Sequence, residues 1–314
     1  MSKIAAWFKA MRLRTLPLSF SVILMGNALA YAFGDSYLMS SSYQQSNWNI
    51  FYLTLLTTLF LQILSNFAND YGDAQKGADD SGRIGPERAI QSGALSKQEM
   101  LVGIVVMALL SLISGIYLLL YSFDFQIHWI FFVFLIVGLG AIAAAIKYTV
   151  GKRAYGYSGL GDVFVFIFFG LVGVIGSFYL QSHRIDWILL FPAITMGCFS
   201  VAVLNLNNMR DRENDQKVGK STLAVLLGFE GSKIYHFILF LLAYLAFPVP
   251  VLGSIEFDQW LIVVALLPIF IFHVFHITKV FSVEDPADYD PELKKIALST
   301  FAFALICFLI VILA

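Results

Sequence analysis

The sequence contains little charge and almost no cysteine. Asp, Glu, Lys and Arg make up 13% of the 314 residues, and the two cysteines, Cys198 and Cys307, lie inside apolar runs. Neither cysteine has disulfide or zinc spacing, so both are expected to be packing residues. His273 and His276 have no acid or cysteine near them in the sequence, which favours packing or an inter-helix hydrogen bond over metal binding.

Two further absences exclude classes of protein. No basic tail or basic domain is present, so nothing indicates binding to nucleic acid. No polar stretch is long enough for a soluble domain, and 59% of the residues are hydrophobic. This composition predicts an all-α integral membrane protein that lies in a lipid bilayer.

Nine apolar runs are long enough to span a membrane. They cover residues 16–33, 50–69, 101–121, 129–148, 160–180, 187–209, 234–253, 260–278 and 296–314. The small residues near position 30 also resemble a signal-peptide cleavage site, but the first run is long for a signal peptide, so we expect it to be retained.

The basic residues predict the orientation of these spans. Nineteen of the twenty lysines and arginines fall in the N-terminal segment or in the loops between even-numbered and odd-numbered spans, and Arg184 is the exception. Because cytoplasmic loops are enriched in Lys and Arg, the N-terminus is expected to be cytoplasmic and the C-terminus outside.

A polar stripe ends the second run. Gln62, Asn66, Asn69, Asp70 and Asp73 recur at helical spacing and share one face about 100° wide. Carboxylates at membrane depth are costly and mark cavities or bound cations, and acids one turn apart are ligands of the kind that Mg²⁺ prefers. Three basic residues follow and suit the phosphates that share the Mg²⁺ shell: Lys76, Arg83 and Arg88.

The same pattern recurs at the end of the sixth run. Asn207, Asp211 and Asp215 are spaced by four residues and are followed by Lys217 and Lys220. We interpret the two stretches as diverged copies of one half-site for metal and diphosphate, and two facing copies could hold two or more cations around one diphosphate. The alternative, that the acids are solvated helix ends, is less consistent with the repeated spacing.

A polar segment between the two motifs leads into the fifth run. It contains Lys147, Tyr148, Tyr157 and Asp162. Asp162 at a helix N-terminus is explained equally well as a capping residue. The functional alternative is that these four residues contact a second substrate or steady a cation.

The spacing predicts one membrane-embedded domain made of two four-helix halves and an appended ninth helix. The first half covers residues 14–148 with a cap loop at 70–98, the second half covers 160–278 with a cap loop at 210–231, and the last helix covers 296–314. Long loops of this kind often act as lids, and membrane proteins with internal repeats commonly place a site at the repeat interface.

Four motifs in order resemble the UbiA superfamily of membrane aromatic prenyltransferases. They are NxxNDYGDxxKGxD at 66–79, RIGPxRxxQxG at 83–93, YxGLGD at 157–162 and NNxRDxxxDxxxGKxTL at 207–223. Within the superfamily they are similar to the 1,4-dihydroxy-2-naphthoate polyprenyltransferase (MenA-type) branch. Two departures from many relatives, Ala89 after Arg88 and an acidic pair spaced by three, also fit that branch.

The resemblance implies an activity and a site. The activity is Mg²⁺-dependent transfer of a polyprenyl group from polyprenyl diphosphate to 1,4-dihydroxy-2-naphthoate in the bacterial inner membrane, with loss of CO₂, giving demethylmenaquinol of menaquinone biosynthesis. The implied metal and diphosphate residues are Asp70, Asp73, Asp211 and Asp215, supported by Asn66, Asn69 and Asn207. The implied diphosphate or cap residues are Lys76, Arg83, Arg88, Lys217 and Lys220.

Two alternatives remain from the sequence. The first is a UbiA-type prenyltransferase that acts on another arene. The second is an ion-coupled transporter, because acids inside membrane spans also mark ion pathways. The acids here cluster at the cytoplasmic ends and not at mid-depth, which favours the enzyme. No obligate protein partner is evident.

Overall fold

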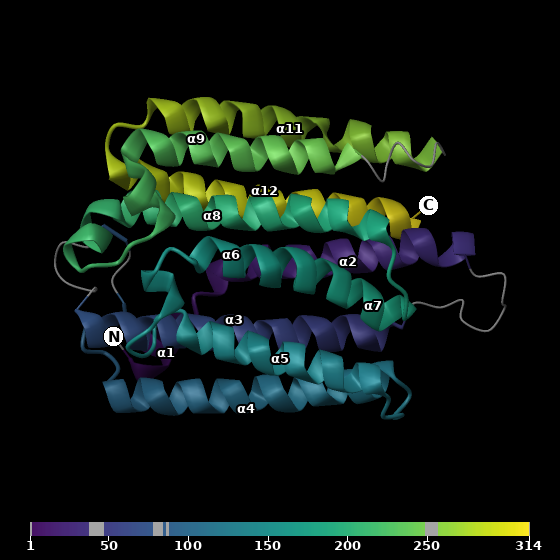
Figure 1. Cartoon of the computed structure of the whole chain (residues 1–314), viewed down its shortest axis with the longest axis horizontal. Helices are drawn as coiled ribbons and strands as arrows, with labels where there is room; N and C mark the ends of the chain where they lie inside the picture. The colour runs from purple at the N-terminus through teal and green to yellow at the C-terminus, as the bar shows by residue number, and fades with distance from the viewer. Residues whose placement is uncertain (1, 38–46, 78–83, 86–87, 249–256, 314) are drawn as a thin grey trace.

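The computed structural model describes residues 2–37, 47–77, 84–85, 88–248 and 257–313. Within these ranges every regular element is a helix, and nine segments are long and apolar enough to cross a membrane. Both findings confirm the prediction. The helices run side by side, and the two chain ends lie at opposite ends of the bundle (Figure 1).

The N-terminal part begins with a short helix that a turn joins to the first long helix. Its elements are α1 (Lys3–Met11), a 3₁₀ turn (Leu13–Thr15), α2 (Leu16–Tyr37), α3 (Trp48–Lys76), α4 (Lys97–Ser122) and α5 (Trp129–Lys147). A capping box starts α4, because Ser96 and Glu99 satisfy each other's backbone N–H groups. Gly77 ends α3 in the left-handed conformation, with φ of 70°. The first motif is therefore helical as far as Lys76, and residues 70–76 of the predicted cap loop at 70–98 belong to α3 instead of a loop.

The C-terminal part contains the remaining spans. The fifth span is composed of α6 (Gly161–Val165), a π-helical segment (Phe166–Gly176) and α7 (Ser177–Ser182). It is followed by α8 (Leu190–Lys217), α9 (Leu223–Ala246), α11 (Phe257–Ser282) and α12 (Tyr289–Leu313).

Helix packing brings the two acidic motifs to the same end of the bundle. α3, which carries the first motif, packs on α4 and α5, and α8, which carries the second, packs on α9 and the π-helical segment. The crossing of the π-helical segment with α8 is close at Gly170 and Gly197, since a Cβ on Gly170 would lie 2.9 Å from the Gly197 Cα. α12 packs on α2 and α8, so it links the first and sixth spans instead of lying appended to the bundle.

The second predicted cap loop is largely wrong. Residues 210–217 continue α8, and α9 starts at Leu223 with Thr222 as its N-cap, so residues 218–222 separate the two helices. Gly228, with φ of 74° and ψ of −176°, interrupts the first part of α9 with a kink. The seventh span thus begins well before residue 234. The polar residues here stay helical because one face of the helix is buried, including Asp211, Asn214 and Asp215. Composition alone does not reveal that burial.

Candidate active site

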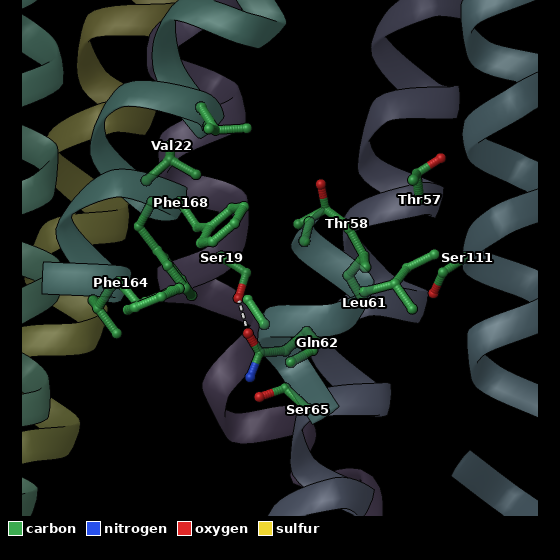
Figure 2. A pocket seen from close by; sticks show the side chains of 18 of the residues that line it. Ser19, Val22, Thr57, Thr58, Leu61, Gln62, Ser65, Ser111, Phe164 and Phe168 are labelled. Carbon is green, nitrogen blue, oxygen red and sulfur yellow. Dashed lines mark hydrogen bonds between the residues drawn. The ribbon is translucent and has the colours of Figure 1, made fainter. Parts of the chain in front are cut away.

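A cavity of about 460 Å³ opens between α2, α3, α4, α5 and the fifth span. One end is polar, lined by Arg12, Asn66, Asn69, Asp73, Arg88, Tyr148, Asn207 and Lys220. Figure 2 shows the adjoining region, with Phe164 and Phe168 on one side and Thr58 and Leu61 of α3 on the other. A hydrogen bond from Ser19 to Gln62 joins α2 to α3 there. The remaining wall is mainly aliphatic and aromatic, which suits a ligand with a polar head and an apolar tail.

The first acidic pair is buried and surrounded by donors. Asp70 and Asp73 are 1% and 4% exposed. The Arg88 guanidinium lies 2.6 Å from Asp73 Oδ2 and 3.6 Å from Asp70 Oδ1, and it donates to the Asn69 carbonyl at 2.9 Å. The Tyr157 hydroxyl donates to Asp73 Oδ1 at 2.8 Å. The pair is thus held in place before any ligand enters.

Arg12 also belongs to this cluster, which the sequence reasoning missed. It is in the left-handed conformation, with φ of 46°, at the turn between α1 and α2, and its guanidinium pairs with Asp70. The Asn66 amide holds the same turn by donating to the Met11 carbonyl at 2.9 Å and to Thr15 Oγ1 at 3.2 Å. In the sequence Arg12 counted only as one of the basic residues that predict orientation.

The other amide of the first motif, Asn69, lies against Thr149, two residues beyond the end of α5. Thr149 Oγ1 is 3.3 Å from Asn69 Oδ1 and donates to the Ala68 carbonyl at 2.9 Å. Gly72 permits this approach, because a Cβ there would lie 2.5 Å from Thr149 Oγ1. The turn after α5 thus fixes the position of α3 next to the acidic pair.

The second motif is organised by a buried arginine. Arg210, which is 2% exposed, donates from Nε to Asp211 Oδ1 at 2.9 Å and from Nη2 to Asp211 Oδ2 at 2.7 Å. The same Nη2 donates to Asn207 Oδ1 at 2.9 Å. Arg210 stands within the matched motif, but its position beside Asp211 in the sequence did not single it out.

Asp215 completes the second motif one turn further along α8. The Lys220 ammonium lies 3.3 Å from Asp215 Oδ1, and both side chains are buried. Asp215 Oδ2 is buried and has no hydrogen-bond partner in the part of the chain that the structure describes. One buried carboxylate oxygen of the second motif is therefore available to a cation.

Tyr157 bridges the two motifs. Its backbone carbonyl accepts from the Ser221 N–H at 3.1 Å, while its hydroxyl donates to Asp73 of the other motif. The Lys76 ammonium lies 3.6 Å from the centre of the Tyr157 ring, and that of Lys220 lies 5.7 Å away. One aromatic ring thus holds two cations beside the acids.

Tyr148 and Asp162 lie next to this bridge. Burial raises the pKa of Tyr148, and the carboxylates of Asp162 and Asp215 add to the increase, so its hydroxyl remains protonated. Asp162 is buried in the first turn of α6 and accepts from the Tyr235 hydroxyl at 3.4 Å. It does not cap the helix, since the N-cap position is Leu160 and no side-chain bond forms there.

Three predicted basic residues are not placed in the cluster. Lys147 and Lys217 are exposed at the ends of α5 and α8, and neither lines the cavity. Arg83 lies outside the described residues. The basic groups that surround the acids are Arg12, Lys76, Arg88, Arg210 and Lys220.

The donor set fits Mg²⁺ that arrives with a diphosphate. Among the described side chains, no three His, Cys, Asp or Glu groups converge to hold a metal by themselves. Mg²⁺ is commonly held by one or two carboxylates together with substrate phosphates and water. Each of the four acids has a basic partner here, so an incoming diphosphate could take over the basic groups while its cation takes the carboxylates. The free Asp215 oxygen is consistent with this exchange.

Comparison with known proteins decides the family. The UbiA prenyltransferase family matches residues 27–291. The chain belongs to the UbiA prenyltransferase family. A curated relative, 1,4-dihydroxy-2-naphthoate octaprenyltransferase of Haemophilus influenzae, is 43% identical over 94% of this chain and 92% of its own length. The protein of the same name from Mycobacterium tuberculosis is 35% identical over 73% of this chain and 72% of its own length.

Solved UbiA structures share the fold. A UbiA homologue from Archaeoglobus fulgidus bound to GPP and Mg²⁺ has a TM-score of 0.64 at 15% identity, covering 96% of this chain and 99% of its own. An apo UbiA homologue from Aeropyrum pernix also has a TM-score of 0.64, at 14% identity over 96% and 98%. The protein is thus a multi-pass membrane protein with the UbiA fold.

Proposed function

We propose that this UbiA-family chain transfers a polyprenyl group from polyprenyl diphosphate to 1,4-dihydroxy-2-naphthoate with loss of CO₂. The observation that supports this is the pair of buried acidic motifs, each with basic partners, of which Asp73 and Asn207 line the polar end of a largely apolar cavity. The naphthoate acceptor is inferred from the names of relatives up to 43% identical.

Different residues are proposed to bind the diphosphate head and the prenyl tail of the substrate. Asp70, Asp73, Asp211 and Asp215 are proposed to hold Mg²⁺, with Asn207 beside them. When bound, Mg²⁺ neutralises charge on the departing diphosphate. The basic groups around the acids are proposed to bind the phosphate oxygens: Arg12, Lys76, Arg88 and Lys220. The prenyl tail lies along the apolar wall, where Phe164 and Phe168 line the cavity.

The proposed reaction begins with ionisation of the allylic diphosphate. The bond between the allylic carbon and the diphosphate oxygen breaks, and its electron pair leaves with diphosphate. The allylic cation that remains is shielded from water and faces aromatic rings. The electron-rich naphthoate ring attacks this cation at the carbon that bears the carboxylate, and departure of CO₂ returns an electron pair to the ring. Tyr148, which lines the cavity, and Asp162 are proposed to contact the arene.

The basic residues support a cytoplasmic active site in the bacterial inner membrane. α1 and the ends of α3 and α8 that carry the acidic motifs lie at one end of the bundle (Figure 1), and the sequence assigns nineteen of the twenty Lys and Arg residues to the N-terminal segment and the loops expected on that side. The C-terminus, at the other end of the bundle in Figure 1, is then outside.

Turnover by the purified protein in detergent tests this proposal. Polyprenyl diphosphate and either 1,4-dihydroxy-2-naphthoate or 4-hydroxybenzoate are supplied with Mg²⁺ or with EDTA, and product and CO₂ are followed by mass spectrometry. A prenylated naphthoquinol formed with CO₂ in Mg²⁺ alone is the expected result. Product from 4-hydroxybenzoate alone would show that the acceptor is not the naphthoate. No product from either arene would favour the ion-coupled transporter.

A further inference from the structure

The first turn of α12 makes contact with the second acidic motif, although the two are about 80 residues apart in sequence. Asp290 pairs with Nη1 of Arg210, the arginine that binds Asp211 and Asn207. Resting on the function proposed above, we propose that Asp290 is a positioning residue that keeps Asp211 and Asn207 available to the Mg²⁺–diphosphate. It acts through Arg210 and not by touching the substrate.

The geometry of Arg210 and Asp211 requires an external anchor. Neighbouring residues on an α-helix point about 100° apart, so their side chains do not face each other. Arg210 nevertheless donates to both Asp211 oxygens, at 2.9 Å and 2.7 Å. A long side chain turned sideways along its own helix needs a fixed point elsewhere, and Asp290 supplies one from α12.

The charge of Asp290 is a second reason to assign it this role. A single guanidinium that faced Asp211 alone would neutralise that carboxylate and weaken it as a metal ligand. Asp290 shares the same guanidinium, so the three groups together keep one net negative charge when both acids are ionised. That remaining charge is what attracts a divalent cation to this half of the site.

The first turn of α12, on which Asp290 lies, is anchored to other helices by contacts that do not involve Arg210. Two residues further along the chain, buried Glu292 accepts from His276 Nδ1 at 2.6 Å and pairs with Lys295 at 2.6 Å. His276 Nε2 then lies 2.9 Å from His236 Nε2 on α9, so the chain of bonds connects three helices. The start of α12 is therefore a rigid support for Asp290.

Replacing Asp290 with asparagine separates this role from a general structural one. Asp290→Asn keeps the shape and removes the charge, Asp290→Glu keeps the charge, and exposed Asp288→Asn, in the same segment and without an ion pair among the described residues, is the matched control. Binding of Mn²⁺ with pyrophosphate is measured by the EPR signal of free Mn²⁺. Turnover is measured as a function of Mg²⁺ concentration.

We expect Asp290→Asn to weaken Mn²⁺ binding and to raise the Mg²⁺ concentration for half-maximal turnover by about tenfold or more, as loss of a group that orients a metal ligand commonly does. Asp290→Glu should recover most of this loss, and Asp288→Asn should match wild type.

The idea is overturned if Asp290→Asn binds Mn²⁺ as wild type does, or if it lowers turnover equally at every Mg²⁺ concentration. Failure of the proposed function is distinguishable, because wild type would then make no prenylated naphthoate while the Mn²⁺ comparison could still be made.

Discussion

Replacing Tyr157 with phenylalanine removes one hydroxyl and leaves the ring beneath Lys76. The lost bond is the 2.8 Å donation to buried Asp73. A hydrogen bond to a charged group contributes about 1.5–3 kcal/mol, which corresponds to about a ten- to hundredfold change in kcat/KM if the bond persists in the transition state. Since Asp73 is proposed to bind the metal and diphosphate, we expect this loss in kcat/KM for polyprenyl diphosphate.

A series of variants separates the hydroxyl from the ring. Tyr157→Leu also removes the ring that lies 3.6 Å from the Lys76 ammonium, so it should lose a further few-fold, as a cation–π contact of about 0.5–1 kcal/mol predicts. Tyr71→Phe is the matched control, because within the described part of the chain the Tyr71 hydroxyl, on the same helix as Asp73, bonds to Gln75 alone, accepting at 2.9 Å. The assay is steady-state turnover at saturating naphthoate and Mg²⁺.

The effect of Tyr157→Phe should not depend on pH near neutrality. Burial raises the pKa of Tyr157, and the Asp73 carboxylate adds to the increase, so the hydroxyl stays protonated. Because its pKa in the folded protein is above the ordinary value of 10.0, its contribution to stability is complete below that pH and is lost as pH rises further. A Tyr157→Phe rate within twofold of wild type, or an equal loss in Tyr71→Phe, would refute the reasoning.

Three further predictions concern the metal site, the helix crossing and the approach of α5 to α3. Asp70→Ala or Asp211→Ala should abolish turnover and leave a folded, detergent-stable protein, checked by size-exclusion chromatography; near-normal activity in either would contradict the site. Gly170→Ala places a Cβ 2.6 Å from the Ala193 carbonyl and should cost about 1–3 kcal/mol, seen as a lower Tm in detergent. Gly140→Ala, with open space around its Cβ, is the control, and an equal Tm in both variants would rule out a tight crossing. Thr149→Val should lower Tm by an amount equivalent to about 1 kcal/mol, because it removes the donor to the Ala68 carbonyl; an unchanged Tm would mean that this bond adds nothing.

Local sequence patterns correctly predicted the helices where polar residues recur along one helix face. The spacing of Asn66, Asn69, Asp70 and Asp73 correctly indicated one helical face, and the structure continues that helix to Lys76. The number of spans followed from run length because backbone groups in a bilayer must be satisfied within helices. The predicted loop at 210–231 failed because polar composition was interpreted as solvent exposure, whereas Asp211 and Asp215 are polar and buried.

The sequence by itself determined the all-α class, the nine spans, the two acidic motifs and the family resemblance, because each depends on residues close together in the chain or on an ordered set of motifs. Only the tertiary structure decided which bases meet which acids. Arg12 reaches Asp70 and Asp290 reaches Arg210 across 58 and 80 positions, while Lys147 and Lys217 remain exposed despite lying next to the motifs. Such pairings depend on how helices pack and which way their faces turn, and no local spacing encodes that.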